Sequence, residues 1–285
     1  MNNRYDFIFL FDVQDANPNG DPDAGNLPRV DVETGQGLVT DVCLKRKIRN
    51  YVAMTGGNAD GKRIYFTEGA VLNNLHKEAH QVEGIPASDS KSPKEGKKDK
   101  ATAWMCRNYY DVRTFGAVMS TEINCGQVRG PVQVSFARSI DPIVSSEHAI
   151  TRSSVTNEKD AEKERTMGRK FTVPYALYRA HGFVNPFLAQ QTGFSEADLG
   201  VLFDALKNAF QFDQSAARPA GSMNPRALLV FKHETMLGAA PSHSLFDLVK
   251  LSKKEVIEAP RSFADYALTI DKSAIPAGVA LQELI

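Results

Sequence analysis

The sequence predicts an α+β fold, and the order of its elements is compatible with a ferredoxin-like or RRM-like sheet that carries large insertions. Short apolar segments predict strands, and two amphipathic segments predict helices between them. A long polar excursion separates two of the predicted strands and indicates an extended hairpin. The order allows the ferredoxin-like topology without requiring it.

Bulk composition narrows the class of protein. The chain has 285 residues, 42% of them hydrophobic, which suits one large domain or two ordinary ones. No apolar run approaches the roughly 18 residues that span a membrane, and the first residues lack the apolar segment of a secretory signal. The three cysteines are never spaced CxxC, which argues against a disulfide framework and a structural zinc site. We therefore expect a soluble protein of the reducing cytosol, without a metal or another cofactor.

The first predicted strand, Tyr5–Val13, is apolar and aromatic, and it runs into a loop with the sequence NPNGDPDAGNLPR at residues 17–29. The loop excludes regular structure, because Pro removes donors while Gly and Asn tolerate positive φ. Its acidic residues do not form a calcium loop, since Ala24 stands where Gly is needed and Val30 where a bidentate Glu belongs. These residues alone do not explain what the loop is for.

A helix is predicted next, capped by Thr40 and Asp41 and ended by the TGG at residues 55–57. Its apolar positions have helical spacing: Leu44, Ile48, Tyr51 and Val52. The second predicted helix follows Ser195 and carries its own apolar face: Leu199, Leu202, Phe203, Leu206 and Phe210.

Three cations share one side of the first helix. The chain has 34 basic and 34 acidic residues, so a nucleic-acid partner requires charge that is segregated locally. At about 100° per residue, Lys45, Arg49 and Arg46 fall at about 100°, 140° and 200°, with Lys47 apart from them. A solvated face and a helix that follows a phosphate backbone are both compatible with this arrangement. We expect no acidic partner one turn away from these cations, and this favours binding.

The remaining segments alternate between strands and polar regions. Residues 84–100 are rich in lysine and indicate a flexible exposed insertion. Within residues 130–143, Val132, Val134 and Phe136 alternate with polar or small residues and predict a half-buried strand. The polar excursion from Ile150 returns to strand character at residues 171–184, where Pro174 suggests an edge or a bulge. The segment RALLVFKHE predicts a last strand.

Few residues carry a recognisable chemical motif. His76 and His80 are spaced i, i+4 but lack the glutamate of HExxH, so a solvated helix face is favoured over a metal site. The segment RTFGAVMS, which begins at Arg113, fails the RRM aromatic motif, and Phe115 is expected in the core. Neither GxSxG nor a P-loop is present.

Five separated blocks together resemble one family. In order they are NPNGDPDAGNLPRVD, LKRKIRNYV, DVRTFGAVMS, GPVQVSFARSIDPI and RTMGRKFTVPYALYRAHGFVNP. They look like the backbone subunit of the CRISPR type I-C Cascade complex, an RNA-binding protein of the RAMP superfamily. The resemblance extends to about Lys232 and is less distinctive at residues 84–100 and in the C-terminal fifth.

The resemblance implies a single RRM-like palm over residues 1–285, a finger-like insertion at 55–112 and a hairpin thumb at 148–172. Copies of such a subunit assemble along the CRISPR RNA and leave its bases exposed to pair with a target DNA strand. The implied partners are further copies, an RNA-capping subunit and a large subunit. The implied location is the prokaryotic cytoplasm, with no membrane partner.

The resemblance also implies which residues lie along the RNA. Lys45, Arg46 and Arg49 would bind phosphates, Met167 would be a wedge at the thumb, and the loop at 215–218 would border the channel. The full implied set is Arg29, Lys45, Arg46, Arg49, Arg138, Arg152, Arg165, Met167, Arg169, Ser215 and Arg218. No catalytic residue is implied.

Two alternatives stay open. Some relatives in the superfamily cut RNA, and a metal-assisted ribonuclease would use loop carboxylates such as Asp21, Asp23 or Asp31. No histidine lies near them in the sequence to act as a second acid–base group. The other alternative is a structural scaffold that makes no contact with RNA.

Overall fold

A large antiparallel sheet forms the centre of the molecule. The computed structural model describes residues 1–57, 59, 61–162 and 166–285. The sheet has the strand order β14-β11-β1-β10-β8-β4, and β7 and β9 also pair with β10. The strands are β1 Tyr5–Ala16, β4 Gln36–Val39, β7 Val132–Val134, β8 Ala137–Pro142, β9 Ser146–Thr151, β10 Met167–Val184, β11 Met223–His233 and β14 Val279–Glu283. The predicted α+β class is confirmed.

Strand β1 lies at the centre because residues 7–11 are apolar toward both faces of the sheet. Residues 5–13 are all buried, and β1 pairs antiparallel with β10 on one side and β11 on the other. Phe7, Phe9 and Phe11 pack on one face, while Ile8 and Leu10 pack on the opposite face. Such a strand, covered on both faces, gives a continuous apolar run instead of alternation.

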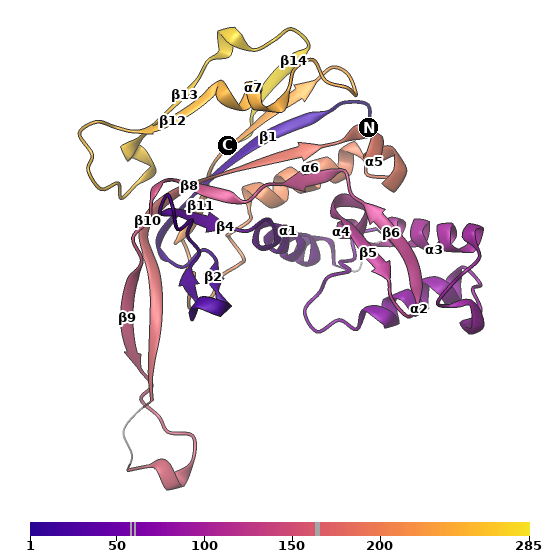
Figure 1. The fold of residues 1–285 in the computed structure, drawn as a ribbon, viewed down its shortest axis with the longest axis horizontal. Helices are drawn as coiled ribbons and strands as arrows, with labels where there is room; N and C mark the ends of the chain where they lie inside the picture. The colour runs from indigo at the N-terminus through magenta and orange to yellow at the C-terminus, as the bar shows by residue number, and fades with distance from the viewer. Residues whose placement is uncertain (58, 60, 163–165) are drawn as a thin grey trace.

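Helices α1 (Asp41–Gly56) and α6 (Glu196–Lys207) pack on the face of the three phenylalanines (Figure 1). Both predicted helices are confirmed, including their N-caps. Thr40 accepts from the Cys43 amide, and Ser195 forms a capping box with Asp198. The short α5 (Pro186–Thr192) lies on the same face, which the sequence did not indicate.

The opposite face is covered by the C-terminal part of the chain. Helix α7 (Ser242–Asp247) and the ribbon of β12 (Val249–Lys253) and β13 (Tyr266–Ile270) lie over it (Figure 1). No helix among the described residues is both long and apolar enough to span a bilayer.

A second unit with its own core lies beside the sheet (Figure 1). It contains α2 (Leu72–Val82), α3 (Glu95–Asn108), α4 (Tyr110–Phe115), β5 (Gly116–Ser120) and β6 (Asn124–Arg129). The expectation that residues 84–100 are a flexible insertion is wrong for their second half, which begins α3. Ala101, Trp104 and Met105 of α3 are buried, so its apolar side holds the preceding lysine-rich turn in a helix.

The predicted solvated position of His76 and His80 is wrong, because both side chains are buried in this unit. His76 Nε2 hydrogen-bonds the Tyr65 hydroxyl at 2.8 Å, and His80 Nε2 hydrogen-bonds the Asn124 carbonyl oxygen at 2.9 Å. Burial lowers the pKa of His76. Among the described residues no group of three metal-ligating side chains occurs, and Phe115 lies in the core as expected.

A two-stranded hairpin projects from the sheet (Figure 1). Strand β9 pairs antiparallel with the first part of β10. Thr151 lies opposite Met167 at one end of this pairing, and Ser146 lies opposite Thr172 at the other. Strand β10 then continues into the sheet. Pro174 lies where β10 enters the sheet, so it is not on an edge strand. Its neighbours pair with Ala16 and Gln14, and Asp15 between these two has φ 50°, a local irregularity that accommodates the missing amide.

We expect Gly182→Ala to destabilise the fold, because Gly182 pairs with Phe7 across β10 and β1. An added Cβ would lie 1.9 Å from Phe7 Cζ in the core, so the ring has to move. Overpacking of this kind costs about 1–3 kcal/mol of unfolding free energy, measured by urea denaturation. Gly200→Ala is the control, since it meets nothing within 4 Å on α6 and should stabilise by about 0.5–1 kcal/mol. Equal stabilities for the two variants would contradict this packing.

Candidate nucleic-acid interface

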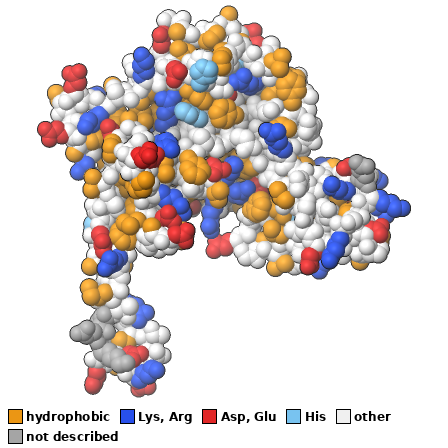
Figure 2. All heavy atoms as spheres, in the orientation of Figure 1, with side chains coloured by type: hydrophobic (Ala, Val, Ile, Leu, Met, Phe, Trp, Pro, Cys, Tyr) orange, Lys and Arg blue, Asp and Glu red, His pale blue; other side chains and the backbone are white. Residues whose placement is uncertain are grey.

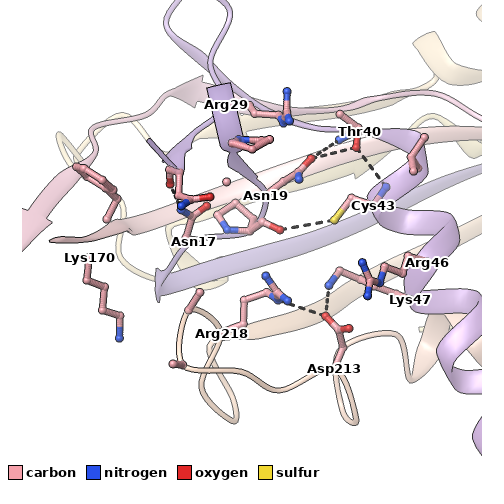
Figure 3. A pocket seen from close by; sticks show the side chains of 18 of the residues that line it. Asn17, Asn19, Arg29, Thr40, Cys43, Arg46, Lys47, Lys170, Asp213 and Arg218 are labelled. Carbon is pink, nitrogen blue, oxygen red and sulfur yellow. Dashed lines mark hydrogen bonds and ion pairs between the residues drawn. The ribbon is translucent and has the colours of Figure 1, made fainter. Parts of the chain in front are cut away.

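A groove of about 990 Å³ lies beside the N-terminal half of α1. Its walls are the loop at residues 17–29, the base of the β9–β10 hairpin and the loop at residues 213–218 (Figure 3). Between the projecting hairpin and the unit that contains α3, Figure 2 shows Lys and Arg side chains with Asp and Glu side chains beside them. Six cations line the groove: Arg29, Arg46, Lys47, Arg169, Lys170 and Arg218. The groove therefore combines a cationic surface with backbone from several elements.

The loop at residues 17–29 forms one wall because Asn19 fastens it to α1. Asn19 Oδ1 accepts from the Thr40 amide at 3.0 Å and from the Thr40 hydroxyl at 3.1 Å, and Thr40 Oγ1 caps the Cys43 amide (Figure 3). The loop itself folds as the short pair β2 (Gly20–Asp21) and β3 (Leu27–Pro28). Its dense turn residues thus produce a small ribbon that is fixed against the positive end of the α1 dipole, which favours anions.

Asp213 fastens the opposite wall to α1 (Figure 3). Its carboxylate pairs with Lys47, accepts from Arg218 Nε at 3.2 Å and accepts from Asn50 Nδ2 at 3.3 Å. The Lys47 side chain is only 3% exposed. Sequence reasoning set Lys47 apart from the other cations of the helix, and no local signal reveals a partner 166 residues away.

A second hollow of about 750 Å³ lies on the other side of α1. It shares Asp41, Val42, Arg46 and Asn50 with the first groove, so the two meet over the exposed side of the helix. The expectation that the three cations lack acidic partners is wrong. Each is paired: Lys45 with Asp41 at 2.9 Å, Arg46 with Glu68 at 2.8 Å and Arg49 with Asp111 at 2.8 Å.

Only one of these three pairs is fully exposed. The side chains of Arg46 and Glu68 are 64% and 87% exposed, so their pair contributes little and a phosphate can displace it. Arg49 lies between the rings of Phe66 and Phe115, and its partner Asp111 is buried. Arg46 is therefore available to a ligand, whereas Arg49 also holds the second unit against α1.

The other residues predicted to contact RNA fall into two groups, those at the groove and those away from it. Arg29, Arg169 and Arg218 line the groove, whereas Ser215 closes the loop by exchanging backbone hydrogen bonds with Arg218. Arg29 pairs with Asp21 at 3.2 Å. Arg169, 72% exposed, pairs with Glu147 on the hairpin at 3.1 Å.

Arg138, Arg152 and Met167 lie outside the residues that line this groove. Arg138 pairs with Asp31 at 2.6 Å, and this hydrogen bond lowers the pKa of the Asp31 carboxyl. Arg152 donates to Thr166 Oγ1 at 3.3 Å on the hairpin. Met167 begins β10 and is 69% exposed, while Arg165 lies outside the described residues.

Several residues that line the groove are absent from the set that the resemblance implies. Lys170, Phe171 and Asn17 are among them, together with two half-exposed apolar side chains, Phe136 and Ile150. Phe136 was expected on the buried side of its strand, which is wrong. Strand β7 ends at Val134, and the phase changes before β8 begins, so Ala137 is buried and Phe136 faces the groove.

Comparison with known proteins identifies both the fold and the family of this chain. The chain is similar to one from a solved "CRISPR RNA-guided surveillance complex, pre-nicking", with a TM-score of 0.50, 14% identity and coverage of 80% of this chain and 78% of that one. A family model, "CRISPR-associated protein Cas7", matches residues 3–271. A CRISPR-associated protein Cas7 from Haloferax volcanii is 29% identical over 256 residues, which cover 81% of this chain and 71% of the relative. The chain belongs to the Cas7 family.

We expect Asp213→Ala to destabilise the fold because it leaves the Lys47 ammonium buried without its carboxylate. Breaking a buried pair in this way costs about 3–5 kcal/mol of unfolding free energy, measured by urea denaturation. The control is Asp204→Ala on α6, whose pair with Lys207 is 55% and 35% exposed and should contribute less than about 1 kcal/mol. A loss for Asp213→Ala as small as the control's would show that Lys47 does not depend on this carboxylate.

Proposed function

We propose that this chain is the non-catalytic backbone subunit of a type I-C Cascade surveillance complex. It binds CRISPR RNA through the sugar–phosphate backbone and polymerises along the guide. The observation that carries the proposal is the meeting of the two hollows over α1, which share Arg46 and Asn50. A path of this kind suits an elongated polyanion better than a compact ligand, and membership of the Cas7 family supports the identity of that polyanion.

The topology supports the proposed division into palm, finger and thumb. The strand order β11-β1-β10-β8, with α1 and α6 on one face, supports an RRM-like palm. The unit that contains α3 is the finger, and we extend it from the expected end at residue 112 to residue 129, because β5 and β6 share its core. The hairpin of β9 and β10 is the thumb, with Met167 as the wedge that interrupts base stacking.

Within this arrangement the guide runs from the base of the thumb across α1 to the finger. Arg46, Arg169 and Lys170 bind phosphates, and the exposed rings and aliphatic side chains near the thumb support the sugars or bases. The bases face away from the protein and pair with the target DNA strand. The partners are further copies of the chain, an RNA-capping subunit and a large subunit, in the cytoplasm of a prokaryote.

The loop carboxylates support a non-catalytic role. Asp21 pairs with Arg29 and accepts from the Asp23 amide at 3.2 Å. Asp31 pairs with Arg138 and accepts from the Glu33 amide at 3.1 Å. These carboxylates already order the loop, which weakens the alternative that they serve metal-assisted ribonuclease chemistry.

Loss of two cations that line the groove should weaken all RNAs alike. We expect Arg46→Ala/Lys170→Ala to bind single-stranded RNA more weakly and to reduce the slope of log affinity against log salt by about 0.7 for each lost phosphate contact. Fluorescence anisotropy across a salt series, with repeat-derived and unrelated RNAs, measures this. These positions are preferred over Lys45 and Arg49, whose ion pairs are less exposed.

The matched control is Lys250→Ala/Lys254→Ala, which removes two exposed cations at β12, outside the groove. It should leave the slope unchanged. A loss of affinity that is confined to particular RNA sequences contradicts backbone binding. An unchanged salt slope in Arg46→Ala/Lys170→Ala supports a scaffold that makes no contact with RNA at this groove.

The nuclease alternative has its own test. Asp21→Asn/Asp23→Asn should leave labelled RNA as intact as the natural chain does, in buffers with Mg²⁺ or Mn²⁺, because neither chain is expected to cut it. Cleavage by the natural chain that the double variant abolishes would replace the proposed function with a metal-assisted ribonuclease.

A further inference from the structure

Arg46 is the only cation shared by the described residues that line the two hollows beside α1. Its guanidinium is held by Glu68, with 2.8 Å between Arg46 Nη2 and Glu68 Oε2. Glu68 also lines the second hollow, and its side chain is 87% exposed. The cation at which the two hollows meet therefore already holds an anion, and the chain itself supplies that anion.

A tight turn carries Glu68 beside the hollow. Residues 67–70 form a β-turn in which the Ala70 amide donates to the Thr67 carbonyl oxygen at 3.1 Å. Gly69, the third residue of this turn, has φ 75°, close to the value in a type II turn, and glycine adopts it without strain. The local backbone thus fixes the place from which the Glu68 side chain reaches Arg46.

Glu68 differs from Asp111, the partner of the neighbouring Arg49. The buried Asp111 carboxylate also accepts from two backbone amides, at 2.8 and 3.1 Å, so it orders the fold around it. The Glu68 carboxylate has no partner other than Arg46 among the described residues. An exposed pair of this kind contributes little to stability, so the needs of the fold do not explain it.

A carboxylate and a phosphate compete for the same guanidinium, because both accept charge-assisted hydrogen bonds from its N–H groups. Since Glu68 is attached to the chain, it competes at an effective concentration of about millimolar. A single phosphate group rarely displaces such a competitor. A nucleic-acid backbone does, because it offers phosphates to several cations of the groove at once.

We propose that Glu68 is an autoinhibitory carboxylate, which occupies the phosphate-binding donors of Arg46 until a nucleic-acid backbone displaces it. The inference rests on the proposed function, because it takes the ligand that lies across α1 to be a nucleic acid. It adds a residue that lowers the affinity for RNA to the residues that raise it.

The first measurement compares the natural chain with Glu68→Gln, by fluorescence anisotropy of single-stranded RNA. Glutamine keeps the size of the side chain and removes its charge, and thermal unfolding should be unchanged because the position is exposed. We expect Glu68→Gln to bind RNA about 1.5- to 5-fold more tightly, the range that corresponds to the strength of exposed ion pairs.

The matched control is Glu283→Gln at β14. It breaks another exposed pair, with Lys272 at 2.7 Å, and removes the same charge outside both hollows. The affinity of this control for RNA should equal that of the natural chain.

A double-mutant cycle with Arg46→Ala separates the proposed competition from general repulsion between Glu68 and RNA. If Glu68 acts by occupying Arg46, then Glu68→Gln should give no measurable gain in a chain that already carries Arg46→Ala. General repulsion predicts the opposite, a gain at least as large, because Arg46 no longer neutralises the carboxylate. A gain that survives in Arg46→Ala therefore overturns the inference, as does an unchanged affinity of Glu68→Gln alone.

Probes of different sequence complete the test. The gain in Glu68→Gln should be the same for uridine and adenosine probes, because Arg46 is proposed to bind phosphate. A gain confined to one base overturns the competition with phosphate. Failure of the natural chain to bind any of these RNAs overturns the proposed function itself.

Discussion

The candidate interface depends on carboxylates and an amide that hold helix α1 from three sides. Asp213 holds one wall of the groove through Lys47, Asn19 holds the opposite loop through Thr40, and Asp111 holds the second unit through Arg49. Each of these contacts joins α1 to a different element of the chain. The helix therefore fixes the relative positions of the groove walls, and its hydrophobic side is only part of the reason it stays in place.

These contacts change the meaning of the cations along the groove. A lysine or arginine with a buried carboxylate partner stabilises the fold and contributes less to a long-range field than its formal charge indicates. Arg46 and Arg169 have exposed partners and release them at small cost. The formal net charge of zero is compatible with a binding surface because the compensating acids lie beside the cations that they orient.

Local sequence patterns identified much of the fold. The buried strand β1, the helices α1 and α6 with their caps, and the part of β10 that lies in the sheet follow from periodicity and cap chemistry within each segment. Strand β9 and the first residues of β10 carry no such pattern, and the sequence marked their region only as a polar excursion between strands. Two predictions were wrong, one because the alternation of buried and exposed residues restarts between strands, and the other because neighbouring residues impose a helix. Phe136 lies past the end of β7, where alternation restarts, and the lysine-rich turn before Ala101 is helical only because the following residues bury an apolar side.

The site was harder to predict because its geometry comes from tertiary pairs. Lys47 and Asp213 are 166 residues apart, and Arg49 and Asp111 are 62 apart, distances at which no spacing rule applies. Asn17 was visible only as one of many turn residues. In the structure its side-chain nitrogen donates to the Asn26 carbonyl oxygen, and its side-chain oxygen is left without a partner.

The length of β10 has a mechanical consequence. This single strand of 18 residues runs from the projecting hairpin through the middle of the sheet, a contour of about 60 Å. Hydrogen bonds to β1 and β8 clamp its second half, so the hairpin is a stiff cantilever whose root lies in the core. The direction in which the hairpin points is therefore set by the sheet.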